Sequence, residues 1–174
     1  MSDKNLKGLV QVYTGDGKGK TTAALGMALR AAGQGLKVIF IQFLKGEPGG
    51  EHFIMEKCPA FEIRQFGKGD IFAKSDEELL DETNRALVFA KETIARGNYD
   101  VVILDEIFIA HWRGFISLQQ ILDLIRSKPE HVELVMTGRK APYEVVKEAD
   151  LVSEILMIKH PFNEGVRQRK GIEY

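Results

Sequence analysis

The sequence has a single cysteine, almost no net charge and no long hydrophobic run. Cys58 is alone among 174 residues, which excludes an internal disulfide and any zinc site built from several cysteines. A formal net charge of −1 argues against a nucleic-acid-binding protein that relies on a basic surface. No apolar run approaches the roughly twenty residues of a membrane span, and the N-terminus does not look like a signal peptide. We therefore expect a cytoplasmic protein with no nucleic-acid or membrane partner.

Patterns for metal binding through histidine and for a protein nucleophile are also missing. The four histidines (His52, His111, His131 and His160) share no ligand spacing, so all four are interpreted as non-ligands. No serine or cysteine lies in a nucleophile-elbow pattern. The protein is therefore not expected to supply a covalent nucleophile itself.

What the sequence does contain is typical of one globular α/β domain. Hydrophobic residues make up 44% and charged residues 28% of the chain, and its length suits a single domain over residues 1–174. Short apolar runs alternate with helical stretches, which predicts a mostly parallel central sheet of about six strands with helices on both faces. Residues 160–174 have no regular period and are interpreted either as a frayed terminus or as a lid over a ligand.

The element boundaries follow from apolar runs, capping boxes and glycine or proline positions. The predicted strands are 9–13, 37–43, 61–66, 101–105, 133–137 and 152–159. The predicted helices are 22–32, 76–96, 118–126 and 142–149, the last opening at Pro142 as its first residue.

A glycine-rich loop joins the first predicted strand to the first helix. It reads T-G-D-G-K-G-K-T-T over residues 14–22. In such a loop, backbone N–H groups and the helix N-terminus bind phosphate, Lys20 adds a positive charge and the Thr21 hydroxyl can hold Mg²⁺. The position that is usually the first glycine is Thr14, so the loop is one residue short, which leaves open how the nucleotide is seated. The candidate nucleotide-binding residues are Thr14, Gly15, Asp16, Gly17, Lys18, Gly19, Lys20, Thr21 and Thr22.

Charged side chains follow other predicted strands at the edge where open α/β sheets bind ligands. Asp105 and Glu106 end an apolar strand, and paired with the loop they favour a metal site over a merely solvated strand end. Arg139 follows the fifth strand and is either a phosphate-binding or a solvated side chain. Arg30, on the helix that leaves the loop, is either solvated or turned toward the phosphates.

Taken together, these segments resemble the phosphate-loop class of corrinoid adenosyltransferases. The resemblance spans nearly the whole chain and rests on five stretches in order. They are Y-T-G-D-G-K-G-K-T-T at 13–22, Q-F-L-K-G at 42–46, L-D-E-I at 104–107, T-G-R at 137–139, and K-H-P-F followed by G-V and G-I-E-Y within 159–174. It implies a RecA-like P-loop fold and transfer of the 5′-deoxyadenosyl group of ATP to Co(I) of a corrinoid, with triphosphate as the leaving group.

The resemblance also implies roles for particular residues and partners. Lys20, Thr21 and Glu106 would be catalytic, with Mg²⁺ or Mn²⁺ held by Thr21 and Glu106 and with Asp105 behind them. Arg30 and Arg139 would contact the nucleotide. The corrinoid and ATP are the substrates, a reduced flavoprotein is a candidate electron donor, and a homodimer is expected. Because Co(I) is itself a strong nucleophile, the missing protein nucleophile is accounted for.

The corrinoid side differs from the family pattern. In relatives, a pair of aromatic residues after the third strand, one a tryptophan, displaces the lower ligand of cobalt. Here the segment 67–72 reads G-K-G-D-I-F, so Phe72 is its only aromatic residue. The sequence also begins close to the first predicted strand, where some relatives carry a segment that covers the corrinoid. Both differences leave open which corrinoid is preferred.

Two alternative functions are compatible with a phosphate-binding loop. A small nucleoside kinase is disfavoured because kinases of the thymidine-kinase type usually carry a cysteine zinc ribbon, and this chain has one cysteine. A RecA-like ATPase that binds a polymer is disfavoured by the near-zero net charge and the short length.

Overall fold

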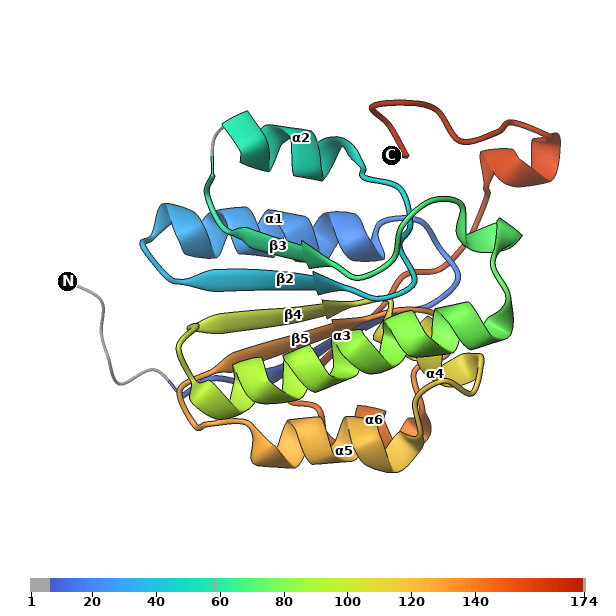
Figure 1. Cartoon of the computed structure of the whole chain (residues 1–174). Coiled ribbons are helices and arrows are strands. Elements are labelled where there is room, and N and C mark those ends of the chain that lie inside the picture. Colours follow the sequence, from blue (N-terminus) through green and yellow to red (C-terminus); the bar gives the residue numbers. More distant parts are fainter. Residues whose placement is uncertain (1–6, 58, 174) are drawn as a thin grey trace.

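The sheet is six-stranded and entirely parallel, as the alternating sequence pattern predicts. The computed structural model describes residues 7–57 and 59–173, so Cys58 and Tyr174 lie outside the described residues. The sheet order is β3-β2-β4-β5-β1-β6 (Figure 1). The strands are β1 Val10–Thr14, β2 Val38–Gln42, β3 Glu62–Gln65, β4 Val101–Asp105, β5 Glu133–Thr137 and β6 Leu151–Glu154.

Helices cover both faces of this sheet (Figure 1). Helices α1 (Lys20–Gly33) and α2 (Gly50–Lys57) lie on one side. Helices α3 (Asp76–Arg96), α4 (Ile107–Trp112), α5 (Leu118–Ser127) and α6 (Tyr143–Glu148) lie on the other. Two short 3₁₀ turns, η1 (Ile71–Ala73) and η2 (Pro161–Glu164), lie outside these layers.

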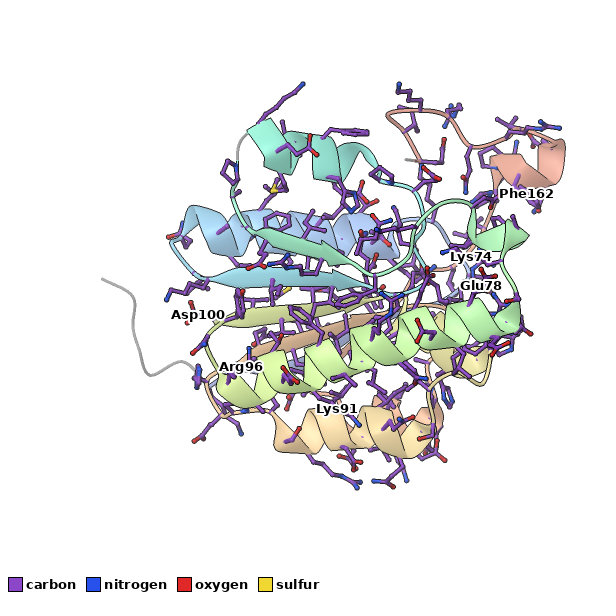
Figure 2. All side chains as sticks on the ribbon, viewed as in Figure 1. Lys74, Glu78, Lys91, Arg96, Asp100 and Phe162 are labelled. Carbon is purple, nitrogen blue, oxygen red and sulfur yellow. The ribbon has the colours of Figure 1, made fainter. Side chains whose placement is uncertain are left out.

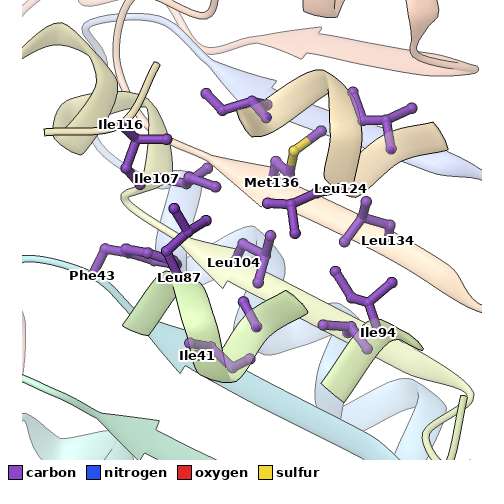
Figure 3. Packing of buried hydrophobic residues seen from close by; sticks show 14 of the residues in the cluster. Ile41, Phe43, Leu87, Ile94, Leu104, Ile107, Ile116, Leu124, Leu134 and Met136 are labelled. Carbon is purple, nitrogen blue, oxygen red and sulfur yellow. The ribbon is translucent and has the colours of Figure 1, made fainter. Parts of the chain in front are cut away.

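The core is divided into two parts because the central strands are apolar on both faces. All five residues of β2 and of β4 are buried. On the side of α3 and α5, side chains of the strands pack against those of the helices (Figure 3). Among the labelled residues of this cluster are Ile41, Leu104, Leu134 and Met136 from the sheet and Leu87, Ile94 and Leu124 from the helices. Under α1 the core is smaller, with Ala24 and Ala28 fitting against Phe40 and Ile103.

Local sequence signals fix the two longest helices on the larger-core side. At the start of α3, the Ser75 side chain accepts from the Glu78 N–H, and the Glu78 side chain accepts from the Ser75 N–H. At its end, Gly97 adopts a left-handed conformation. Ser117 and Gln120 form the same box at α5. Both capping boxes were predicted from the sequence, and both helices begin at the predicted residue.

The structure differs from the predicted elements at helices α2, α4 and α6 and at strand β6, and α1 begins at Lys20 instead of residue 22. Helices α2 and α4 were not predicted. Helix α4 has no side-chain cap at its N-terminus and starts directly after β4. Pro142 is the N-cap of α6 rather than its first residue. The predicted strand 152–159 is wrong in extent, since β6 spans Leu151–Glu154 only. The Ile155 N–H still donates to the Thr14 carbonyl oxygen, but β1 ends at Thr14, and the Ile155 carbonyl accepts from Gly17 in the loop that follows. Among the described residues, no helix is long and apolar enough to cross a membrane.

Candidate functional site

The loop between β1 and α1 is held by the segment that follows β6. Gly15 has φ +100°, and a Cβ there would come within 2.4 Å of the Ile155 carbonyl oxygen. A Cβ at Gly17 would lie 2.6 Å from the Leu156 carbonyl oxygen. The Gly17 N–H donates to the Ile155 oxygen at 2.7 Å, so one backbone amide that was predicted to bind phosphate is already bonded within the chain. Backbone packing therefore requires glycine at both positions.

Lys20 lies inside the loop rather than in solvent. Its Nζ donates to the carbonyl oxygens of Gly15 and Gly17, both at 2.8 Å. The residue is 7% exposed, and burial lowers the pKa of its ammonium group. The negative charge of Glu106 opposes that shift. A cation held at this position is available to a polyphosphate that binds the loop.

Asp105 ends β4 as a buried acceptor that joins three strands and α1. The Thr21 hydroxyl donates to Asp105 Oδ1 at 3.0 Å, and the Thr137 hydroxyl donates to the same oxygen at 2.7 Å. Gln42 Nε2 donates to Oδ2 at 3.4 Å. Burial raises the pKa of Asp105, and the hydrogen bonds from Thr137, Thr21 and Gln42 oppose this rise. The three donors favour the ionised carboxylate.

Glu106 follows in a left-handed conformation, with φ 61°. Its N–H donates to Thr137 Oγ1 at 3.0 Å. Its Oε2 atom is buried without a hydrogen-bond partner among the described residues. Burial, with the nearby charge of Asp105, raises the pKa of Glu106 to about 7. A buried carboxylate with an unbonded oxygen suits a cationic ligand.

The donor set at this edge fits a magnesium ion. Thr21, Asp105 and Glu106 provide only oxygen atoms, which Mg²⁺ prefers. Within residues 7–57 and 59–173 there is no group of three or more His, Cys, Asp or Glu side chains able to hold a metal. An ion here would therefore share its ligands with substrate phosphates, as is usual for Mg²⁺. The structure bonds Thr21 directly to Asp105, so the carboxylate nearest to this hydroxyl is not the predicted Glu106.

Arg139 lies across the mouth of the loop. Its Nη1 atom is 3.7 Å from Asp16 Oδ1, and both side chains are more than half exposed. The loop that carries Arg139 is held by Thr14, whose hydroxyl accepts from the Ala141 N–H at 3.1 Å. The hydroxyl of Thr14, a residue predicted to bind the nucleotide, therefore bonds the backbone of the Arg139 loop. Gly138, with φ +140°, allows this loop to pass close to Phe108.

A second polar group extends the site toward α2. Gln42 Nε2, which bonds Asp105, also donates to Glu51 Oε1 at 3.4 Å, and Lys45 Nζ lies 2.9 Å from the same Glu51 oxygen. Burial is the largest single influence and raises the pKa of Glu51, but the hydrogen bonds from Lys45, the backbone and Gln42, with the Lys45 charge, together outweigh it and the pKa is lowered. From the sequence, residues 42–46 were identified only as a family motif. A polar glutamine at the end of an otherwise apolar strand was the available signal.

The C-terminal tail reaches the loop through one ion pair. Lys18 Nζ lies 2.9 Å from Glu173 Oε1, and Arg169 bonds Glu173 through its side chain and its backbone N–H. The bonds from Arg169 and then Lys18 lower the pKa of Glu173 to about 2. This contact was not predicted from the sequence.

Two predicted site residues are not joined to this group of contacts. Arg30 lies ten residues beyond Lys20, roughly 15 Å along α1. It lines an open depression with Arg96 and Asp100. Figure 2 shows Arg96 and Asp100 at the end of the molecule opposite Lys74 and Glu78. Phe72, in η1, is 91% exposed.

The remaining predicted residues have ordinary surroundings. Gly19 is the N-cap of α1, and Thr22 is exposed on its first turn. Each histidine bonds a backbone group through one ring nitrogen. These contacts join His52 to Gly49, His111 to Ile116, His131 to Gly97 and His160 to Phe162.

Comparison with known proteins points to one family. The family model described as "ATP:corrinoid adenosyltransferase BtuR/CobO/CobP" matches residues 6–174. Corrinoid adenosyltransferases of Pseudomonas aeruginosa and Escherichia coli K12 are 33% and 34% identical, with 98% and 97% of this chain and 86% of each relative covered. The "Corrinoid adenosyltransferase CobA" of Salmonella typhimurium is 34% identical over 97% of this chain and 86% of that protein.

A solved structure supports the fold alone. The flagellar accessory protein FlaH from Methanocaldococcus jannaschii superimposes with a TM-score of 0.59 at 13% identity. The match covers 85% of this chain and 71% of that one.

Proposed function

The chain belongs to the ATP:corrinoid adenosyltransferase family, and we propose that it performs this transfer at the edge formed by Lys20, Thr21, Asp105 and Glu106. The activity is transfer of the 5′-deoxyadenosyl group of ATP to Co(I) of a corrinoid. The kinase and ATPase alternatives are not supported by the relatives. The observation that carries the site assignment is the hydrogen bond from Thr21 in the loop to the buried Asp105 at the end of β4.

In this reaction no group of the protein has to form a covalent bond with a substrate. The Co(I) lone pair forms the cobalt–carbon bond at C5′ of the ribose, the C5′–O bond breaks, and triphosphate leaves with the electron pair. No proton has to move, so the buried carboxylates need not act as bases. The protein has to align the two substrates and stabilise negative charge on the leaving group.

Several groups are suited to that second task. Lys20 lies within the loop, and Arg139 and Lys18 lie on its rim, so three cations surround the proposed triphosphate position. Thr21 and Glu106, with Asp105 behind or beside them, would hold Mg²⁺ or Mn²⁺. When bound, that ion would neutralise further charge on the phosphates. The unpartnered Glu106 oxygen supports this assignment.

The finer features of the function are also proposals. Phe72, exposed on η1, would pack beneath the corrinoid ring and keep the lower ligand away from cobalt. Arg30 does not lie beside the loop of its own chain. It would contact only a nucleotide that is not bound in that loop, for example one bound by a second copy of the chain in a homodimer. We also propose a cytoplasmic protein, a single domain with residues 160–174 as a lid, and a reduced flavoprotein as electron donor.

Replacement of Lys20 tests the site assignment. We expect Lys20→Ala to lower the rate of transfer from ATP to cob(I)alamin about 100-fold or more, because a preorganised donor to the leaving group is lost. Lys91→Ala, which removes an exposed lysine from α3, serves as the control and should leave the rate unchanged. Circular dichroism and thermal unfolding would verify that both variants fold. Full activity of folded Lys20→Ala would remove Lys20 from the mechanism.

A further inference from the structure

Thr137 lies between the two carboxylate residues of the site and is fully buried at the end of β5. Its hydroxyl accepts the Glu106 N–H at 3.0 Å and donates to Asp105 Oδ1 at 2.7 Å. Thr137 is not among the residues proposed to hold the metal or the phosphates. It reaches Asp105 and Glu106 because β5 is the parallel neighbour of β4, with Leu104 opposite Met136.

The direction of these two hydrogen bonds is fixed by chemistry. A backbone N–H can only donate, so the Thr137 oxygen must accept from Glu106. The single hydroxyl proton is then free for Asp105, which accepts it together with the proton from Thr21. Asp105 Oδ1 is thereby held between one threonine from the loop and one from the sheet.

The bond to Glu106 acts on backbone conformation. Glu106 has φ 61°, a region that a residue with a side chain rarely adopts, and it is followed at once by α4. No side chain caps α4. The hydrogen bond to Thr137 fixes the amide of this left-handed residue, and the amide sets the direction in which the Glu106 side chain leaves the strand.

We propose that Thr137 is a positioning residue that orients both Asp105 and Glu106 for the metal-bound triphosphate. The proposal rests on the proposed function, since it assigns Thr137 to the same site. It makes the hydroxyl the essential feature, because a methyl group could fill the same space but make neither bond. Residues that orient ligands in this way typically change metal affinity or activity about 10- to 100-fold when replaced.

Three variants separate the hydroxyl from its volume. Thr137→Val keeps the shape and removes the hydroxyl, whereas Thr137→Ser keeps the hydroxyl and removes a methyl group. Thr83→Val is the matched control: Thr83 is buried in α3, and its hydroxyl has no hydrogen-bond partner in the described part of the chain. If Thr137→Val does not fold, Thr137→Ala replaces it.

The test measures binding and backbone protection separately from turnover. Calorimetric titration with MgATP, in the absence of any corrinoid, should show affinity reduced about tenfold or more for Thr137→Val and close to wild type for Thr137→Ser and Thr83→Val. Amide hydrogen exchange in the free protein should show that Glu106 loses protection in Thr137→Val alone.

The outcomes distinguish this inference from the proposed function. Equal MgATP affinity in Thr137→Val and Thr83→Val, or equal losses in Thr137→Val and Thr137→Ser, would overturn the positioning role of the hydroxyl. An unchanged Glu106 amide in Thr137→Val would do the same. Failure of the wild-type protein to form adenosylated corrinoid would instead contradict the proposed function.

Discussion

At the scale of single residues, the site depends on a carboxylate in an unfavourable position. Glu106 is buried, has a left-handed backbone and leaves one oxygen unbonded within the described chain. Such features destabilise a fold and are retained where function needs them. Lys20 and Arg139 offset part of the cost through their positive charges. We interpret Glu106 as a group prepared for a cationic ligand.

Glu106→Gln should therefore stabilise the free protein at alkaline pH. The pKa of Glu106 is about 7 in the folded protein, against 4.5 when unfolded, so the folded state holds its proton more tightly. The free energy of unfolding then falls as pH rises from about 4.5 to about 7, by roughly 2–3 kcal/mol for this group. Urea unfolding at pH 4 and pH 8 measures the effect. The variant should match wild type at pH 4 and exceed it at pH 8.

A matched control shows whether the effect comes from burial. Glu92→Gln alters an exposed glutamate of α3 that pairs with Arg96. It should leave the pH dependence of stability as in wild type. A Glu106→Gln variant that follows the wild-type pH dependence throughout would show that Glu106 titrates normally.

Sequence reasoning found the individual charged residues but not their hydrogen bonds. Lys20, Thr21, Asp105, Glu106 and Arg139 were identified because they follow strands at one edge of a parallel sheet. Which carboxylate meets Thr21 depends on the left-handed turn at Glu106, and no local pattern encodes that turn. Thr137, Gln42 and Glu173 were missed as site residues for the same reason, since their partners are distant in sequence.

At the scale of elements, the segment after β6 has two roles. Its first residues pack on the loop between β1 and α1, where the Ile155 carbonyl accepts from Gly17. Its last described residue, Glu173, pairs with Lys18 of the same loop. A tail joined to the loop at both ends is suited to respond when a nucleotide recruits Lys18. This supports interpreting residues 160–174 as a lid.

Glu173→Ala should release the end of this tail. Removing the shared partner of Lys18 and Arg169 leaves both cations unpaired, so limited trypsin cleavage after Arg167, Arg169 and Lys170 should accelerate. Global stability should change little, because exposed ion pairs contribute about 0–1 kcal/mol. Glu92→Ala, which breaks an exposed pair on α3, is the control. Equal cleavage rates in the two variants would show that Glu173 does not hold the tail.

The η1 turn offers a separate test of the corrinoid side. Because Phe72 is 91% exposed, Phe72→Ala should not lower thermal stability. It should slow the reaction that starts from Co(II) more than the reaction from chemically generated Co(I), since only the former needs the lower ligand removed. Phe53→Ala, at another exposed aromatic on α2, provides the comparison. Equal losses from both starting states would show that Phe72 does not control the axial ligand.

At the scale of the whole molecule, the fold was largely predictable and its exceptions have a physical cause. Short, continuous apolar runs that alternate with helices are typical of the central strands of a parallel sheet. The buried strands Val38–Gln42 and Val101–Asp105 follow this pattern. Helix α4 and the early end of β6 escaped prediction because long-range contacts with the site decide them. The sequence pattern thus encodes the scaffold, and tertiary contacts determine the details of the edge where we propose that the ligand binds.

The most direct test of the account is to identify the phosphate product of a single reaction. Wild-type protein would be mixed anaerobically with ATP, Mg²⁺ and cob(I)alamin, and the products followed by ³¹P NMR and by absorbance before and after illumination. If the protein transfers the adenosyl group as proposed, intact triphosphate and a light-sensitive cobalt–carbon product form in equal amounts. Cleavage of ATP to ADP without an organocobalt product would contradict the proposed transfer.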